Sequence, residues 1–284
     1  MVLNNVTFDA KSGDHLEDVS MEILAPKVVA ICSEDDGPVL ALEQLLLSVG
    51  NIVEGSAQIN RQDTANFKRH PEKYLAVYNM MQLKGKTVEK AITHAIKKVE
   101  GALDVKQTLQ LLVSLGIKYD DRISDMTVSQ REELKIVALL AMRRPVVLLA
   151  DALDQLTDSS REVIAGLIKD YAQKTDSVVF FSSRDISTMM RYANTIYYFS
   201  GNHLTSARDI SMNDTIDCTV TITGTGLPVD AAINMGAHIL EESENRTRLL
   251  FAGNIQALLP LLEQSTITDV RIEDATVDDE LMAY

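Results

Sequence analysis

Four short, nearly continuous apolar runs constrain the fold of this chain more than any other feature. They are VVAIC, VVLLA, VVFFS and TIYYF, at residues 28–32, 146–150, 178–182 and 195–199. A strand that is buried on both faces appears in sequence as a continuous apolar run, whereas a strand with one solvated face alternates apolar and polar residues. The four runs therefore predict a parallel sheet covered by helices, as in an α/β fold.

Helical patterns separate these runs. Pro38 stands where a helix over residues 38–49 would begin, and proline favours that position because its missing N–H is not needed there. Residues 86–118 repeat apolar side chains at helical spacing. Two residue pairs have the spacing of a capping box and predict helix starts: Ser129 with Glu132, and Ser159 with Glu162. We therefore expect strands and helices to alternate through residue 200, interrupted by an all-helical insert.

The two ends of the chain have a different character. Residues 2–8 and 17–24 alternate apolar and polar side chains around a Gly13-Asp14 turn, which predicts a pair of antiparallel strands. Beyond residue 204 we expect a helix over residues 254–264, although Pro260 argues against it. Four further strands are expected at residues 218–223, 237–243, 246–252 and 268–275.

Acidic residues are concentrated in the C-terminal portion. The chain of 284 residues carries 27 Lys and Arg against 41 Asp and Glu, a net charge of −14. Residues 205–284 hold four arginines, no lysine and fourteen acidic residues, a net charge of −10. Such a surface repels phosphate groups. We therefore expect no nucleic-acid partner and no binding to anionic lipid.

Cysteine usage and hydropathy set expectations for the environment of the protein. Cys32 and Cys218 have no partners at metal-ligand spacing, and two cysteines do not make a disulfide framework, so a reducing cytoplasm is expected. The N-terminus has no basic start, and no run of about 18 apolar residues occurs. We expect no direct membrane insertion, so that any link to a membrane passes through another chain.

One segment carries a family resemblance: MTVSQREELKIVALLAMRRPVVLLADALDQLTDSSREVI, residues 126–164. It resembles the succession of signature motif, helix, Walker B strand and D-loop in the ATP-binding subunits of ABC transporters, and the resemblance covers about residues 1–204. It implies a P-loop NTPase-like ABC ATPase fold, an α/β fold with a mixed sheet, helices on both faces and a helical insert at about residues 85–128. Residues 205–284 would form a small acidic α+β domain.

The Walker A loop of that family, GxxxxGK[ST], has lost its chemistry in this sequence. Its backbone N–H groups wrap phosphates, its lysine neutralises charge and its hydroxyl holds magnesium. In this chain the second glycine is Pro38, the lysine is Val39 and the hydroxyl residue is Leu40. The complete slot reads Ser33, Glu34, Asp35, Asp36, Gly37, Pro38, Val39 and Leu40.

Three consecutive carboxylates, those of residues 34–36, stand in this slot just before the expected helix. At about 5 Å and an effective dielectric of about 20, each would repel a phosphate charge by about 3 kcal/mol before salt screening. A helix N-terminus favours negative charge, so we infer that the carboxylates take the place of the phosphate and cap the helix from within the chain. An ordinary acidic turn is the alternative. Both interpretations predict weak or no ATP binding.

The other catalytic slots depart from the family as well. The Walker B pair of Asp and Glu is Ala150 and Asp151, and the H-loop histidine is Arg184. Gln82 is the best candidate for the Q-loop glutamine, with Asn79 as a competitor. Because phosphoryl transfer needs positioned cations, we expect no active catalytic residue and no ATP turnover by this chain alone.

In the family, two subunits meet head to tail, and each ATP site combines one chain's Walker A loop with the other chain's signature motif. In this chain the signature slot contains Thr127, Val128, Ser129 and Gln130 after Met126, and the D-loop slot contains Asp154, Gln155, Leu156 and Thr157. Val128 and Ser129 add side chains where glycines let the backbone approach phosphate. We therefore expect ATP and magnesium only at an impaired site shared with a partner, and no other metal or cofactor.

The leading hypothesis is a non-hydrolytic subunit of a heterodimeric ABC exporter. The ending ITDVRIEDATVDDELMAY is similar to the strand and short helix that close the ATP-binding subunits of bacterial drug and peptide exporters. The resemblance implies two partners, an intact homologous ATP-binding subunit and a transmembrane permease. It also implies a cytoplasmic location at the inner face of the membrane, reached through the permease, with a docking groove formed by the helical insert.

Two other classes of function are open. A pseudo-ATPase scaffold or regulator would keep the fold outside transport, and the absence of neighbouring genes for a permease and an intact ATPase would favour it. A different enzyme could hold a divalent cation through Asp151 and the carboxylates of residues 34–36, since ligands bind at the strand ends of parallel sheets. Helix capping is favoured over metal binding, because no histidine, cysteine nucleophile or base accompanies these carboxylates.

Overall fold

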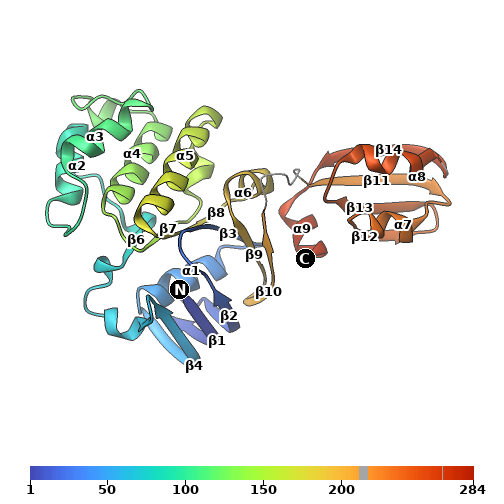
Figure 1. The fold of residues 1–284 in the computed structure, drawn as a ribbon, viewed down its shortest axis with the longest axis horizontal. Helices are drawn as coiled ribbons and strands as arrows, with labels where there is room; N and C mark the ends of the chain where they lie inside the picture. Colours follow the sequence, from blue (N-terminus) through green and yellow to red (C-terminus); the bar gives the residue numbers. More distant parts are fainter. Residues whose placement is uncertain (211–216, 264) are drawn as a thin grey trace.

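The computed structural model describes residues 1–210, 217–263 and 265–284 and arranges their strands in three sheets (Figure 1). The main sheet has the strand order β10-β9-β3-β8-β7-β6, in which β10 alone runs antiparallel. Its strands are β3 (Lys27–Ser33), β6 (Leu75–Val77), β7 (Val146–Leu149), β8 (Val178–Ser182), β9 (Thr195–Ser200) and β10 (His203–Asp209). Each of the four apolar runs lies in a parallel strand, as predicted.

A second, antiparallel sheet covers one side of the main sheet. Its order is β2-β1-β4-β5, with bounds β1 (Val2–Ala10), β2 (His15–Glu22), β4 (Gly50–Ile59) and β5 (Gln62–Asp63). The predicted strand pair is confirmed, although β2 begins two residues early. Helix α1 (Gly37–Leu46) lies between the two sheets, and its buried Leu42 and Leu45 share one core with Phe8 and Phe180. Burying each such leucine contributes about 1.5–3 kcal/mol.

Helices cover the opposite face of the main sheet. These are α4 (Val128–Ala141), α5 (Asp158–Thr175) and α6 (Ile186–Tyr192), while α2 (Val88–Ile96) and α3 (Val105–Val113) pack against α4. The helical segment expected over residues 86–118 is therefore two helices. Short 3-10 turns complete this part: η1 (Thr64–Phe67), η2 (Pro71–Lys73), η3 (Tyr78–Met80), η4 (Ile123–Asp125) and η5 (Ala152–Gln155). Within the described residues, no helix combines the length and apolar character that crossing a bilayer requires.

The third sheet belongs to the C-terminal residues and has the order β12-β13-β11-β14. Its elements are β11 (Cys218–Thr225), α7 (Val229–Asn234), β12 (Ala237–Ser243), β13 (Arg246–Phe251), η6 (Ile255–Leu258), α8 (Leu259–Glu263), β14 (Thr266–Asp274) and α9 (Val277–Ala283). Up to β14 this is the β-α-β-β-α-β succession of a split β-α-β sandwich. All four strands expected there are present.

One expectation for the C-terminal residues needs correction. The helix expected over residues 254–264 is a 3-10 turn followed by the five-residue α8, in which Pro260 stands in the first turn, where its missing N–H costs nothing. Gln264 lies outside the described residues. The strand β10 pairs with β9 in the main sheet up to Asp209, so the main sheet continues past residue 204. An edge strand with one solvated face alternates in burial, so β10 lacked the apolar run of its neighbours.

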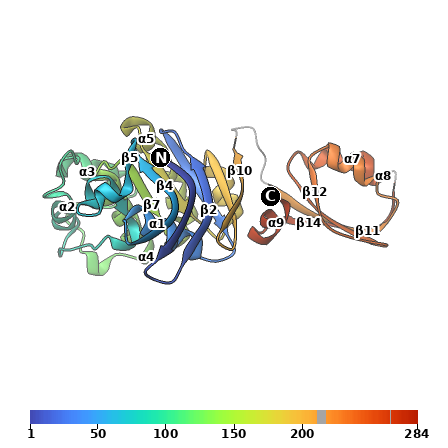
Figure 2. The same cartoon turned by 90° about the horizontal axis from the view of Figure 1, so that it is seen from below.

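Residues 1–210 form what we call the body, and residues 217–284 form the C-terminal unit. The C-terminal unit lies at the opposite end of the molecule from α2 and α3 (Figures 1 and 2). Helix α9 lies between the third sheet and the body, and it contacts β12 and β13 on one side and β3 and β9 on the other. We propose a domain boundary between Asp209 and Asp217.

Candidate functional site

The slot of residues 33–40 leads from β3 into α1 at the carboxyl edge of the main sheet. In open α/β sheets this edge is where ligands bind. A cavity of about 300 Å³ opens beside the slot. It is lined by Ile31, Ser33, Glu34, Asp35, Asp36, Val39, Asp151, Ser182, Ser183, Arg184, Val277 and Asp278. The structure thus brings the Walker A, Walker B and H-loop slots together, and α9 adds a wall that sequence reasoning missed.

The Asp35 side chain accepts a hydrogen bond from the backbone amide at the start of α1. Its Oδ1 accepts the N–H of Gly37 at 2.8 Å, and the Ser33 hydroxyl donates to the Asp35 carbonyl at 2.6 Å. A Cβ at Gly37 would lie 2.9 Å from the same Oδ1, so glycine permits this approach. The expected capping is found for Asp35. Asp36 is the N-cap residue by position, but its side chain makes no capping hydrogen bond.

Two of the three apolar replacements in the slot are structural, whereas the third, Leu40, is exposed. Pro38 and Val39 are buried, and Val39 joins the core between the two sheets. Proline also removes one N–H from the helix start. The side chains here therefore do not suit a triphosphate with magnesium, because the donor set consists of carboxylates where phosphate needs cations and N–H groups.

An ion pair spans the slot. Arg184, in the loop after β8, places Nη2 at 3.8 Å from Oδ2 of Asp36. Both side chains are more than half exposed, so the pair contributes little free energy. The pair places an acid on the phosphate-loop slot, which contains no cation, and a base at the H-loop slot.

The Walker B slot is tied to β8. Asp151 has a left-handed backbone, with φ of 50°, and the Ser182 hydroxyl donates to its Oδ1 at 2.7 Å while accepting its N–H at 3.0 Å. Ala150 has no side-chain ligand to offer. In the D-loop slot, Asp154 accepts the Ser183 hydroxyl and the N–H of Arg184. The carboxylates of both slots are thus engaged with the H-loop segment of the same chain.

The signature slot forms the start of α4. Thr127 is the N-cap residue: its Oγ1 accepts the N–H of Gln130 at 3.2 Å, and Oε1 of Gln130 accepts the N–H of Thr127 at 3.0 Å. The capping box predicted from Ser129 and Glu132 is therefore wrong. Ser129 donates instead to Oε1 of the buried Glu133 at 2.8 Å, and its hydroxyl accepts the N–H of the D-loop residue Thr157.

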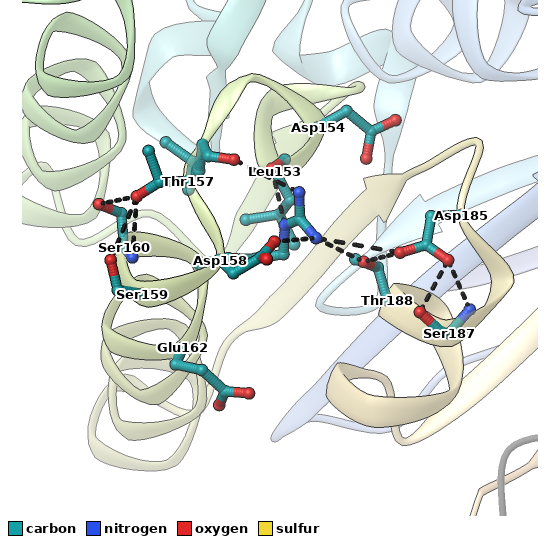
Figure 3. Close-up of polar contacts among 12 residues, drawn as sticks. Leu153, Asp154, Thr157, Asp158, Ser159, Ser160, Glu162, Asp185, Ser187 and Thr188 are labelled. Carbon is teal, nitrogen blue, oxygen red and sulfur yellow. Dashed lines mark hydrogen bonds and ion pairs between the residues drawn. The ribbon is translucent and has the colours of Figure 1, made fainter.

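The second predicted capping box is also wrong. Thr157 is the N-cap residue of α5, and its Oγ1 accepts the N–H of Ser160 (Figure 3). The prediction had used Ser159 and Glu162, which lie two residues further along the chain. Both mistakes have one cause, because an N-cap needs an extended backbone, and that backbone occurs at the threonines.

Arg161 links the D-loop segment to α6, and sequence reasoning missed it. Its guanidinium donates to the carbonyls of Leu153 and Leu156 in the D-loop segment and to the Thr188 hydroxyl of α6. Asp185 caps α6 nearby. Burial opposes its ionisation, but hydrogen bonds from Thr188 and Ser187 and the charge of Arg161 outweigh burial and hold the pKa of Asp185 below its usual value.

The two Q-loop candidates lie in different places. Gln82 is exposed beyond η3. Asn79, within η3, donates to Oε2 of Glu43 on α1 at 3.1 Å. Burial raises the pKa of Glu43, and this hydrogen bond partly offsets the rise. Asn79 is thus the candidate that contacts the helix following the phosphate-loop slot.

The metal-binding alternative gains no support from the geometry. Among the described residues, no group of three or more His, Cys, Asp or Glu side chains is arranged to hold a metal ion. Glu34, Asp35 and Asp36 are exposed, and Asp35 is already bound to a backbone amide.

No protein-family model matches this sequence, and no curated protein matches it significantly. Several solved structures, however, are similar to this chain. The chain is similar to cbiO1 from Clostridium perfringens, part of the ABC transporter complex cbiONQ, with 15% identity and a TM-score of 0.61 over 73% of this chain and 87% of that one. It is similar to the ATP-binding cassette MJ0796 in a dimeric structure bound to ADP and Pi, with 18% identity and a TM-score of 0.60 over 74% and 98%.

A third similar structure is a bacterial Atm1-family ABC exporter with ATP bound. The identity is 17% and the TM-score 0.61, over 73% of this chain and 38% of the exporter chain. At these identities the likeness shows the fold alone, which is that of an ABC transporter ATP-binding subunit. The predicted fold class, an α/β fold with a mixed sheet and helices, is confirmed.

Proposed function

We propose that this chain is an ABC transporter subunit that does not hydrolyse ATP by itself and that pairs with an intact ATP-binding subunit and a membrane permease. The observation that carries the proposal is the Asp35 carboxylate on the amide of Gly37, the place where this fold presents N–H groups to phosphate. The Asp36 carboxylate, which lies beside Arg184 across the slot, adds a second negative charge against an anionic ligand.

The lack of hydrolysis follows from the same slots. Val39 is buried in the core, Ala150 has no ligand atom, and the Asp151 carboxylate is bound to Ser182. No cation in the slot faces a transferring phosphoryl group, and the exposed Arg184 is paired with Asp36. Catalysis would then rest on the partner's own residues.

The start of α4 is the surface that this chain would offer to the partner's nucleotide. Helix N-termini attract phosphate, and Val128 there is 54% exposed. The hydroxyl of Thr127 and the amide of Gln130 are both used in the capping box. A nucleotide at this site would meet the helix dipole and few free donors, so we propose a shared site of reduced affinity.

A groove of about 590 Å³, formed within the body where residues 71–81 lie beside residues 98–100 and the end of α4, is our candidate for the permease contact. Its lining is largely apolar and includes Tyr74, Met80, Met81, Val99 and Met142. Met80 is 63% exposed, and methionine adapts to varied apolar partners. A short amphipathic helix of a permease would suit this groove, and docking would hold the protein at the inner face of the membrane. Export is the proposed direction, from the exporter-like ending of the chain.

Titration calorimetry with Mg-ATP tests the first part of the proposal. The isolated chain should show no binding at nucleotide concentrations up to about 1 mM, and micromolar affinity would overturn the closed slot. The matched control is Arg184→Ala, which removes the base from the slot without touching the Asp35 contact and should leave the result unchanged.

Co-expression with any permease and any ATP-binding subunit whose genes neighbour this one tests the partner assignment. A stable complex whose ATPase activity survives substitution of Asp151 in this chain is the expected result. The scaffold alternative, which the closed slot also favours, predicts that no such genes or complex exist.

A further inference from the structure

Helix α9 carries two adjacent buried carboxyl groups into the contact between the C-terminal unit and the body. Asp279 is 2% exposed and Glu280 is 0% exposed, although α9 has only seven residues. Figure 1 shows α9 between the third sheet and the main sheet. Acidic side chains are almost never buried to this extent unless they are paired. Their partners therefore decide whether α9 can stay docked.

Asp279 has a full set of partners inside the C-terminal unit. Nη2 of Arg248, on β13, lies 2.6 Å from its Oδ1, and the Thr219 hydroxyl donates to its Oδ2 at 3.0 Å. Thr276 completes a capping box with it. Asp279 thus fixes α9 to its own sheet and does not need the body.

Glu280 points to the body and has weaker hydrogen-bond and ion-pair partners than Asp279. The Tyr198 hydroxyl of β9 donates to its Oε2 at 2.8 Å, and Oε1 has no hydrogen-bond partner among the described residues. Arg208 of β10 lies 3.8 Å from Oε2 but binds Asp217 through both terminal nitrogens, at 2.5 and 3.2 Å. Asp217 is itself 1% exposed. One guanidinium therefore faces two buried carboxyl groups.

The remaining groups around Glu280 do not supply the missing positive charge. The Cys32 thiol lies below it on β3, and burial first, then the charges of Glu280 and Asp278, raise the pKa of this thiol to about 12. Tyr284 stacks on Tyr198 and lies beside His238 of β12, with ring centroids 5.1 and 4.7 Å away.

These surroundings favour the neutral form of the Glu280 carboxyl while α9 is docked. Burial first, and then the Asp217 charge, raise its pKa to about 8, while the Tyr198 hydrogen bond and the Arg208 charge offset only part of the rise. An exposed glutamate has its ordinary value of 4.5. The docked form therefore binds one proton more than the undocked form between these two values, so raising the pH within this range favours undocking.

We propose that α9 is a proton-dependent latch, which holds the C-terminal unit on the main sheet while Glu280 is neutral and releases it when the carboxyl ionises. Val277 and Asp278 of the same helix line the cavity of the phosphate-loop slot, so release removes one wall of that cavity. The latch involves only contacts within this chain and does not depend on the transport proposal above.

Alkylation of Cys32 measures the undocked form, because this thiol is 0% exposed in the same core that Val277 and Leu281 cover. Labelling is followed by peptide mass spectrometry from pH 5.5 to 8.5, which separates Cys32 from Cys218. Glu280→Gln is the matched control, since it is neutral at every pH and keeps the shape of the side chain. Dividing the two rates cancels the ionisation of the thiol itself.

The expected ratio of wild-type to Glu280→Gln labelling rises about tenfold per pH unit up to about pH 8 and then levels off. A ratio that stays constant with pH overturns the proposal. Should Glu280→Gln not fold, amide exchange of the unaltered protein decides: α9 must lose protection relative to α5 as the pH rises, and equal behaviour of the two helices overturns the latch.

Discussion

The carboxylates of the phosphate-loop slot and those around α9 differ in burial, and burial decides what each group contributes. Asp36 is more than half exposed and meets Arg184 at 3.8 Å, whereas Asp217 is fully buried and holds Arg208 through two hydrogen bonds. Exposed pairs are screened by water, while a buried charge that loses its partner keeps its desolvation cost. The exposed carboxylates of the slot would therefore repel an anionic ligand while they change the free energy of folding little. The buried charged groups around α9 have a large effect on that free energy.

Arg208→Met should have the largest effect. It leaves two buried carboxyl groups without their guanidinium and should lower the free energy of unfolding by about 3–5 kcal/mol. Chemical denaturation at pH 7 measures this. Arg271→Met is the matched control, because its pair with Asp269 is exposed and its loss should cost no more than about 0.5 kcal/mol. Equal losses would refute the role given to burial.

Arg161→Met should rank second. The substitution leaves the carbonyls of Leu153 and Leu156 without this donor and should cost about 2 kcal/mol. Arg191→Met, which removes an exposed pair with Glu162 and a contact with Tyr192, provides the comparison and should cost far less. Amide exchange should speed up in the D-loop segment of the Arg161 variant alone, and an unchanged exchange rate there would contradict the linking role.

Thr157→Ala tests the helix cap and should cost about 1 kcal/mol, since it removes the N-cap acceptor of α5. Ser159→Ala removes the residue that spacing alone had selected and should change stability by less than about 0.5 kcal/mol. Thermal unfolding of the two variants distinguishes them, and the reverse ranking would restore the original capping assignment.

Asp36→Asn should have the smallest effect on folding. The side chain makes no capping hydrogen bond and its ion pair is exposed, so the free energy of unfolding should change by no more than about 0.5 kcal/mol. A larger loss in urea denaturation would mean that the slot carboxylates contribute to stability as the buried ones do.

Four strands of the main sheet, β3, β7, β8 and β9, were predictable because burial on both faces leaves a local pattern, whereas the three-residue β6 was not predicted. VVFFS and TIYYF needed no knowledge of the rest of the chain. The edge strand β10 was missed because its residues alternate in burial. A loop that crosses a core shows the same alternation, so this pattern does not identify a strand. Which residue caps a helix was also unpredictable, since Thr157 and Ser159 both precede the same apolar pattern and only the backbone conformation separates them.

The sequence predicted which residues stand in each slot of the site, but it did not predict which contacts their side chains make. Residues 33–40 could be assigned by order along the chain, but the Asn79–Glu43 hydrogen bond depends on the 3-10 turn η3, which shifts the position of the side chains after β6. The arrival of α9 beside the slot depends on folding of the C-terminal unit, more than 230 residues further along the chain. Such contacts between distant segments leave no spacing to detect.

The position of α1 between two sheets explains how a loop can change its chemistry and keep its shape. Val39, Leu42 and Leu45 fill a core that both sheets share, whereas residues 34–36 face solvent. In a library randomised over residues 33–46 and selected for folding alone, the apolar positions should tolerate few substitutions and the acidic ones many. Helix α1 holds the two sheets together through its apolar side chains. The residues before it can therefore change, and with them the ligand that the loop binds, without loss of stability.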